Sequence, residues 1–337
     1  MDTSLPTPPP LVSVLIPVYQ VEVYVARCLQ SVLSQSYRPL ELVLIDDRGD
    51  DHSMQIAKEL LANAGEGREV RFLQNEKNEG LAYCRMRLLE EARGKYCLWL
   101  DSDDYWHDSQ DVEHIIEVME RDRLDCLVMD YYADYPKRIE YMKVDCPDTG
   151  QEAARAILTG RMPAYLCNKC FRTDALRQYG GRFRGGRYRL EDYCTSVPFF
   201  AASPRIAYLP MASLHYEQSN SNSLIATLRG ADAHELMAAV DFCKEELWSR
   251  YPTAEQLYGR AIAMAYLSMK AVLLSRCRPA DYATIRALHP EVDHLNASRP
   301  IAWYHRLIYS LQIHPKTSYI GYALLLLLNK WKSIIRR

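Results

Sequence analysis

The sequence predicts an α/β protein in which a doubly wound sheet is followed by a helical C-terminal region. Three observations lead to this fold class. Apolar runs of strand length alternate three times with amphipathic segments between Val12 and Leu100, and acidic residues collect where several of these runs end. From Gly230 onward, long segments with helical spacing replace the alternation. Regular alternation of strand and helix is typical of a parallel sheet, which binds ligands at the carboxyl ends of its strands.

The first strand and helix follow a proline-rich leader. Residues 1–10 contain four prolines and no periodic pattern, so we expect them to be flexible. The run Val12–Ile16 is β-branched and aliphatic and is followed by Pro17, which predicts a buried parallel strand. Residues 22–35 then predict a helix, because apolar residues recur at helical spacing: Val25, Leu29, Val32 and Leu33.

Two further helices and three further strands complete the alternation. Leu40–Ile45 predicts the second strand, and residues 52–63 predict a helix with one apolar face. Val70–Leu73 predicts a short third strand, and residues 78–92 predict the helix that follows it. The apolar and aromatic run Tyr96–Leu100 predicts a fourth, buried strand.

The fourth strand leads directly into a cluster of carboxylates. Asp101, Asp103 and Asp104 surround Ser102 at the point where the strand ends. Carboxylates this close repel one another, and a hard divalent cation that bridges them relieves the repulsion. The alternative without a metal ion is an acidic turn in which one Asp caps the next helix.

The pattern beyond the acidic cluster is less regular. Residues 111–121 predict an amphipathic helix, and Cys126–Tyr131 predicts a strand. Residues 132–146 form a polar stretch that we expect to be irregular, whereas residues 151–158 predict a helix. Ile206–Leu209 predicts the last strand.

Composition restricts the class of protein. The chain has 337 residues, 48% of them hydrophobic and 25% charged, with a net charge of −2, which indicates a globular protein and no nucleic-acid partner. Ten scattered cysteines and the lack of a secretory signal favour free thiols in a reducing cytosol. The single CxxC pair, Cys167 and Cys170, has no second pair to complete a zinc site. The sequence contains no GxGxxG, Walker A or HExxH motif.

Four short motifs in register carry a resemblance to a known family. They are Val12–Tyr19, Leu44–Asp47, Asn78–Gly80 with Arg85, and Leu100–Asp104. In this order and spacing they resemble glycosyltransferase family 2, over roughly residues 11–225. The resemblance implies the GT-A fold and transfer of a sugar from a nucleotide diphosphate donor, with inversion at the anomeric carbon.

The resemblance also implies a donor site. Pro17 and Tyr19 would line the base pocket, and one of Asp46 and Asp47 would accept a hydrogen bond from the uracil imide. A core position for Tyr19 is the open alternative. Lys169 would face the donor phosphates, or else be an ordinary solvated surface lysine. The full set of donor-binding candidates is Pro17, Tyr19, Asp46, Asp47, Arg85, Asp101, Ser102 and Lys169.

The same resemblance implies a metal ion and a catalytic base. Asp101 and Asp103 would hold the ribose hydroxyls and a Mg²⁺ or Mn²⁺ ion bound to the diphosphate. His215 would be a third metal ligand, with a structural role as the alternative. Asp192 would be the general base that an inverting transfer requires. Glu191 would only interact with the N-terminus of its helix.

A glycine- and arginine-rich segment precedes this acidic pair. Residues 177–189 contain five arginines and four glycines. This composition fits a mobile basic loop that closes over the phosphates, or an ordinary exposed loop.

The C-terminal region has a distinctive end. Residues 232–249, 254–276 and 279–288 predict helices. After Asp293 there is no acidic residue, while seven Lys and Arg residues alternate with aromatic ones. The apolar run Tyr319–Leu328 is too short to span a bilayer, which needs about 20 residues. We expect an amphipathic helix at an anionic membrane surface, or a helix docked on the core.

We therefore expect residues 1–10 to be a flexible leader, residues 11–228 to be a GT-A domain and residues 229–337 to be helical with a basic amphipathic end. The expected function is metal-assisted transfer of a hexose or N-acetylhexosamine from a UDP-sugar donor to a glycan or lipid-linked acceptor. The alternative is a non-catalytic module that binds nucleotide sugars. The expected location is the cytoplasm, and peripheral contact with the inner face of the membrane is left open.

Overall fold

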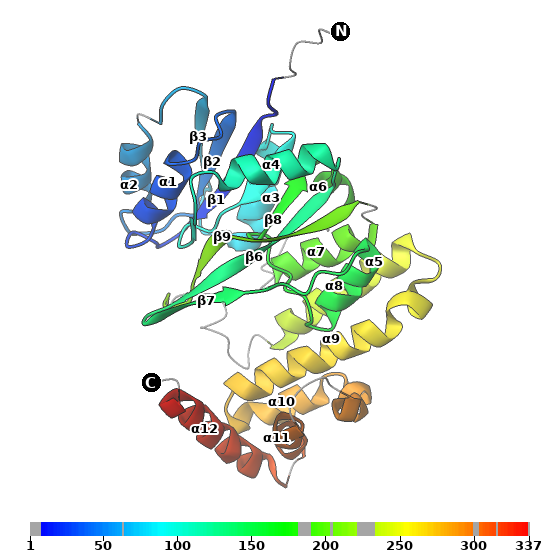
Figure 1. Ribbon diagram of the computed structural model, residues 1–337. Helices are drawn as coiled ribbons and strands as arrows, with labels where there is room; N and C mark the ends of the chain where they lie inside the picture. The colour runs from blue at the N-terminus through cyan, green and yellow to red at the C-terminus, as the bar shows by residue number, and fades with distance from the viewer. Residues whose placement is uncertain are drawn as a thin grey trace. The chain divides into compact units, whose positions relative to one another are not determined.

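A mixed β-sheet organises the first part of the computed structural model (Figure 1). The structure describes residues 8–62, 64–180, 190–202, 205–220, 233–298, 303–314 and 316–335. Within them the strands follow the order β3-β2-β1-β4-β8-β6-β9-β5, and β7 pairs with β6. The strands are β1 (Val12–Val18), β2 (Leu40–Asp46), β3 (Arg68–Gln74), β4 (Tyr96–Trp99), β5 (Tyr105–Trp106), β6 (Cys126–Tyr135), β7 (Arg138–Met142), β8 (Lys169–Arg172) and β9 (Ile206–Glu217).

Helices flank this sheet and make up the second part of the chain. The helices of the first part are α1 (Val25–Leu33), α2 (Ser53–Leu61), α3 (Leu81–Glu91), α4 (Asp111–Arg121), α5 (Gly150–Leu158), α6 (Thr173–Tyr179) and α7 (Glu191–Ala202). Those of the second part are α8 (Ala233–Arg250), α9 (Ala254–Arg276), α10 (Tyr282–Ala287), α11 (Trp303–Ile313) and α12 (Ser318–Ile335). The predicted fold class, a doubly wound sheet followed by a helical region, is confirmed.

The parallel strands β3, β2, β1 and β4 form the centre of the fold. Every residue of β1 is buried, as expected for a strand covered on both faces. Side chains of β1 alternate between faces, so those of Val12, Val14 and Ile16 pack with α1, α2 and α4 in one core. Helix α3 contacts β1 and β2 but has no residue in that core, because it covers the opposite face.

Pro17 lies within β1 instead of ending it. It pairs with Ile45 of β2, whereas pairing between β1 and β4 stops at Leu15. The missing N–H of Pro17 therefore faces the side on which β1 has no further strand partner. This explains why proline is tolerated in a central strand.

Three predicted segments were wrong in detail. Residues 132–146 are not irregular throughout, because β6 continues to Tyr135 and forms an antiparallel hairpin with β7. The tyrosines of this segment favour strands, although its charged residues obscured the pattern. The last strand, β9, continues to Glu217 beyond the predicted Leu209. Residues 279–288 form a 3₁₀ turn, Pro279–Asp281, before the short α10.

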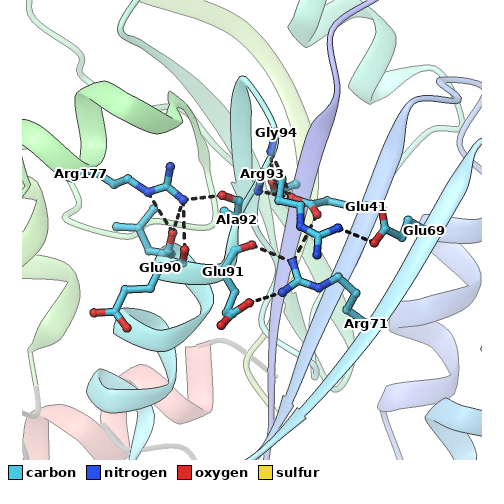
Figure 2. Close-up of polar contacts among 11 residues, drawn as sticks. Glu41, Glu69, Arg71, Glu90, Glu91, Ala92, Arg93, Gly94 and Arg177 are labelled. Carbon is cyan, nitrogen blue, oxygen red and sulfur yellow. Dashed lines mark hydrogen bonds and ion pairs between the residues drawn. The ribbon is translucent and has the colours of Figure 1, made fainter.

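A buried carboxylate fixes the start of β4 at the amino ends of the strands (Figure 2). Glu41 is fully buried, and it accepts hydrogen bonds from the Ser13 hydroxyl and from the backbone N–H groups of Arg93 and Gly94. A Cβ atom on Gly94 would lie 2.5 Å from the Ser13 nitrogen, so only glycine fits there. These contacts hold the strand whose other end carries the acidic cluster.

Guanidinium groups hold the C-terminal end of α3 (Figure 2). Arg177 donates to the carbonyls of Leu89, at 2.8 Å, and of Ala92, while Arg71 donates to the Glu91 carbonyl at 2.8 Å. The last carbonyls of a helix lack partners within it, and positive side chains interact favourably with that end. The contacts therefore fix the position of α3, which carries Arg85.

The second part of the chain is helical, and the predicted domain boundary at residue 228 lies outside the described residues. Its longest helix, α9, is the one described helix that is long and apolar enough to cross a membrane by length and composition, and 56% of its most apolar stretch is buried in the protein. A buried core helix passes the same test. All ten cysteines of the chain are free thiols, as predicted, and nine of them are buried.

Candidate active site

The acidic cluster forms a tight turn directly after β4. Leu100 still donates to the Leu15 carbonyl at 3.1 Å, and the Asp104 N–H closes the turn on the Asp101 carbonyl at 2.9 Å. Asp104 is fully buried: its Oδ1 accepts from the Glu217 N–H at 2.9 Å, and its Oδ2 has no hydrogen-bond partner among the described residues. Asp103 accepts from the Asn220 side chain at 2.9 Å.

Burial and mutual repulsion disfavour the charged forms of these carboxylates. Burial, and then the charge of Asp101, raise the pKa of Asp103 to about 6. Burial, followed by the charges of Asp103 and Asp101, raises the pKa of Asp104 well above its usual value. A divalent cation between these groups would remove the repulsion and stabilise the ionised forms.

The donor atoms fit a hard cation in part. Asp101, Asp104 and Cys167 each offer a ligand atom, and these atoms lie within 4.8 Å of one another. Burial and the neighbouring Asp104 raise the pKa of the Cys167 thiol well above its usual range, so it stays protonated. Carboxylate oxygens are the ligands that Mg²⁺ and Mn²⁺ prefer. Among these three groups, the orphaned Asp104 oxygen and the Asp101 carboxylate are therefore the suitable ligands, and Asp103 offers a further carboxylate in the same turn.

A buried guanidinium joins the acidic turn to the first turn of α7. Arg85, from α3, is only 3% exposed. Its Nη2 lies 3.0 Å from Asp101 Oδ1 and 3.4 Å from Asp192 Oδ1, and its Nε lies 3.3 Å from Glu191 Oε1. One side chain thus brings together carboxylates from two segments that are far apart in the sequence.

The two acids of α7 differ in their electrostatic environment. Burial, and then the charge of Asp192, raise the pKa of Glu191 to about 8. Burial also raises the pKa of Asp192, but Arg85 opposes this shift, as does a hydrogen bond from the Leu166 N–H to the Asp192 carboxylate. Arg85 and the Leu166 N–H thus favour the ionised form of Asp192, which is the form that a base requires.

Comparison with known proteins identifies the family of this chain. The family model described as Glycosyl transferase family 2 matches residues 13–180, which include the acidic turn, Arg85 and Lys169. This chain belongs to glycosyl transferase family 2. The family that the sequence motifs predicted is therefore confirmed.

Relatives of this family 2 chain include bacterial glycosyltransferases. The putative glycosyltransferase EpsH of Bacillus subtilis is 27% identical over 216 residues, which cover 61% of this chain and 60% of EpsH. The uncharacterized glycosyltransferase of Haemophilus influenzae is 38% identical over 96 residues, 28% of this chain and 37% of that protein. The matches thus span less than two thirds of the length of these relatives.

Solved structures confirm the GT-A fold of this family 2 chain. Staphylococcus aureus TarS, residues 1–349, in complex with UDP, matches with a TM-score of 0.63 and 18% identity, over 94% of this chain and 90% of that one. The mannosyltransferase PcManGT of Pyrobaculum calidifontis, in complex with GDP-Man and Mn²⁺, matches with a TM-score of 0.54 and 13% identity, over 94% and 88% of the two chains.

The two aspartates that follow β2 have different environments. Asp47 is buried and accepts from the Asn75 side chain at 2.7 Å and from the N–H groups of Glu79 and Gly80, both at 2.8 Å. Asp47 therefore holds the turn before α3. The sequence did not indicate this structural role. Asp46 is partly exposed, and it accepts from the Arg48 N–H and the Gln74 side chain. Asp46 is thus the more accessible of the two predicted uracil acceptors.

Tyr19 is exposed, which excludes the alternative that it is a core aromatic residue. Pro17, two residues earlier, is buried in β1. Ser102 is buried within the acidic turn. A contact of Tyr19 with a nucleotide base stays a prediction.

Lys169 occupies neither of the positions that the sequence suggested. It is fully buried, and its ammonium donates to the Pro163 carbonyl at 3.2 Å, to the Tyr165 carbonyl and to the Asn168 side chain at 2.9 Å. An ammonium has three donors, and all three are used within the protein. Lys169 therefore holds the 163–168 loop in place and is not available to donor phosphates in this structure.

His215 is held by other side chains in a way that argues against metal binding. Its Nδ1 lies 2.8 Å from Asp134 Oδ1, and its Nε2 lies 2.9 Å from His107 Nδ1. The ring also stacks on Tyr105, with centroids 4.3 Å apart. With both ring nitrogens engaged, His215 has the structural role that was the alternative, and the interpretation of it as a metal ligand is corrected.

Some site residues were not recognised from the sequence. Arg27 donates to the Asp103 carbonyl at 3.1 Å and to the Glu217 carboxylate at 2.9 Å. Nothing in the spacing of Arg27 or Glu217 indicates these contacts, because each depends on long-range pairing. The predicted basic loop falls mainly on residues 181–189, which lie outside the described residues.

Proposed function

We propose that this family 2 chain is an inverting glycosyltransferase that moves a sugar from a nucleotide diphosphate donor to a hydroxyl of a saccharide or lipid-linked acceptor. The observation that supports this most strongly is the position of Arg85. It brings the acidic turn, suited to a metal-bound diphosphate, together with Asp192, suited to a base. A module that only binds nucleotide sugars has no need of an ionisable carboxylate on the acceptor side.

The proposed reaction is a direct displacement. Asp192 takes the proton of the acceptor hydroxyl, whose oxygen bonds to the anomeric carbon while the bond from that carbon to the diphosphate breaks. A single base is enough for inversion, and no covalent intermediate forms. Asp101, Asp103 and Asp104 would hold Mg²⁺ or Mn²⁺, which neutralises charge on the leaving diphosphate when it is bound.

The solved structures suggest the donor class. TarS has been solved in complex with UDP and with UDP-GlcNAc, and PcManGT with GDP-Man and Mn²⁺. From these relatives we infer a UDP-sugar as donor, and a hexose or N-acetylhexosamine as the transferred group. The partly exposed Asp46 is our candidate to accept a hydrogen bond from the uracil imide.

Donor binding is expected to depend on the metal. UDP should bind in the presence of Mn²⁺ and raise the unfolding free energy by about 2.7 kcal/mol at 100 times its Kd. Asp103→Asn should remove the dependence on Mn²⁺ because it removes a carboxylate from the cluster. Calorimetry with Mn²⁺ or EDTA measures this, and Asp174→Asn is the control because its side chain is 84% exposed on α6. Equal UDP affinity of the wild type with Mn²⁺ and EDTA contradicts the proposed metal role.

We also propose that the protein lies in the cytoplasm and contacts the inner face of the membrane through α12. Several apolar side chains of this helix are exposed: Tyr319, Ile320, Leu324, Leu326 and Leu327. The segment after Asp293 has seven basic residues and no acidic ones. Exposed apolar side chains with nearby Lys and Arg are typical of helices that lie in the interface of anionic membranes.

Vesicle binding tests this contact. The wild type should bind vesicles that contain anionic phospholipid, and binding should weaken with salt, because each Lys or Arg near the surface contributes about 1 kcal/mol. The double substitution Ile320→Glu and Leu327→Glu, or deletion of residues 315–337, should release the protein. Val23→Glu changes an exposed valine outside this helix and is the control. Wild-type protein that ignores anionic vesicles at low salt contradicts the proposal.

A further inference from the structure

Three tyrosine rings form a cluster in the sheet-containing part of the chain. Tyr131 is on β6, Tyr165 is in the loop before β8, and Tyr216 is on β9. The rings of Tyr165 and Tyr216 stack with centroids 5.2 Å apart and an interplanar angle of 29°. Tyr131 meets both rings edge-on, at 5.8 Å and 6.2 Å. All three residues are partly exposed and also pack against the hydrophobic core, so the cluster, here called the tyrosine wall, borders the core and keeps part of its surface accessible.

The hydroxyl groups of this tyrosine wall lack protein partners. Within the described part of the chain, none of the three forms a hydrogen bond, and none is completely buried. In contrast, the hydroxyls of Tyr37 and Tyr208 each donate to a protein oxygen. Partly buried tyrosine hydroxyls normally find a partner. The wall therefore presents polar groups suited to a ligand.

The wall adjoins both halves of the proposed active site. Tyr165 directly precedes Leu166, whose N–H bonds to the Asp192 carboxylate. Tyr216 directly precedes Glu217, whose N–H bonds to Asp104 at 2.9 Å. Besides burial, the charge of Asp192 raises the pKa of Tyr165, and the charges of Asp104 and Asp101 raise that of Tyr216, as expected if these two side chains lie near the base and the acidic turn.

Buried contacts hold Tyr165 in this position. The Lys169 ammonium bonds to the Tyr165 carbonyl, and the Ser196 hydroxyl of α7 bonds to the Ala164 carbonyl at 2.7 Å. The loop is therefore fixed to the helix that carries Asp192. Lys169 is therefore a positioning residue, because it holds the loop that carries Tyr165.

We propose that Tyr131, Tyr165 and Tyr216 bind the acceptor saccharide and direct one of its hydroxyls to Asp192. A pyranose ring has an apolar face that packs on aromatic rings and hydroxyls that bond to polar groups, and the wall offers both kinds of contact. The three side chains carry no charge at neutral pH, because a tyrosine hydroxyl ionises only near pH 10 and burial raises the pKa of each of them. A neutral sugar fits them better than a phosphate does. The inference rests on the proposed function, since it assigns the acceptor of that reaction.

Retention on immobilised neutral oligosaccharides, with UDP and Mn²⁺ present, tests the assignment. Wild-type protein should be retained on at least one of them. Tyr165→Ala and Tyr216→Ala should each lower that affinity about tenfold or more, since they remove an aromatic face. Tyr165→Phe keeps the ring and should lower it less. Tyr141→Ala is the matched control, because Tyr141 is an exposed tyrosine of β7 whose hydroxyl bonds to Asp130.

UDP calorimetry on the same variants separates this inference from the donor proposal. We expect unchanged UDP affinity in the tyrosine variants. Three outcomes overturn the acceptor assignment. They are no retention of a UDP-binding wild type on any neutral saccharide, retention that Tyr165→Ala and Tyr216→Ala leave unchanged, and an equal loss of UDP affinity in these variants, which would place the wall at the donor. Retention of a wild type that does not bind UDP contradicts the donor proposal and supports the wall.

Discussion

Replacement of Asp192 by Asn is expected to lower kcat for sugar transfer by about 10²- to 10⁴-fold, with little change in donor affinity. Asparagine keeps the shape of the side chain but does not take a proton. The carboxylate lies 3.4 Å from the Arg85 guanidinium, which favours its ionised form. Initial rates with a matched donor and acceptor, together with UDP calorimetry, measure the two effects separately.

Comparison of acidic residues makes this test specific. Glu191→Gln should lower kcat less, because burial and Asp192 raise the pKa of Glu191 to about 8 and so keep it largely protonated at neutral pH. Asp174→Asn, on the exposed surface of α6, should leave the rate unchanged. If Asp192→Asn is nearly as active as the wild type, the base lies elsewhere, and Glu191 and Asp104 are the next residues to substitute.

Replacement of Arg85 by Gln is expected to destabilise the fold by about 3–5 kcal/mol at neutral pH. The guanidinium is 3% exposed and is the counter-charge for Asp101, Glu191 and Asp192. Without it, three carboxylates share one poorly solvated site. Arg93→Gln is the matched control, since Arg93 pairs with Glu69 on the exposed surface (Figure 2), where an ion pair contributes about 0–1 kcal/mol.

The loss of stability in Arg85→Gln should depend on pH. Arg85 lowers the pKa of both Glu191 and Asp192, so its removal raises both in the folded state. A carboxyl whose pKa is higher folded than unfolded stabilises the fold at low pH and loses that contribution as pH rises through the folded pKa. The difference between the variant and the wild type should therefore grow as pH rises, and the contribution of Glu191 should appear above about pH 8, its pKa in the folded wild type. Urea unfolding at several pH values measures it, and a deficit that is small and equal at all pH values contradicts the role of Arg85.

Much of the fold was predictable because it depends on local patterns. The runs Val12–Ile16 and Leu40–Ile45 are strands because β-branched and aliphatic residues in short runs suit a sheet that is buried on both faces. Amphipathic spacing likewise predicted α1 and α4. The hairpin of β6 and β7 was missed, because its stability comes from pairing between strands, which single-strand periodicity does not report.

The candidate site was predictable only in its parts. Spacing and resemblance singled out Asp101, Asp103 and Asp192, because motifs retain the chemistry that a reaction needs. They did not show whether Lys169 faces the donor phosphates. In the structure its ammonium is buried and donates to three acceptors within the protein. Nor did they show that both nitrogens of His215 are already engaged. Many partners of such side chains come from segments that are distant in the sequence, so the neighbouring residues do not identify them.

The sequence by itself determined the α/β class, the family and the acidic cluster, since each depends on residue types at short spacing. Only the tertiary structure decided that Arg85 joins Asp101 to Asp192, across 91 positions of the chain. It also decided that Tyr131, Tyr165 and Tyr216 meet beside them. The physical reason is that charge and ring contacts act over a few ångströms in space, and the crossovers of a doubly wound sheet set those distances independently of separation along the chain.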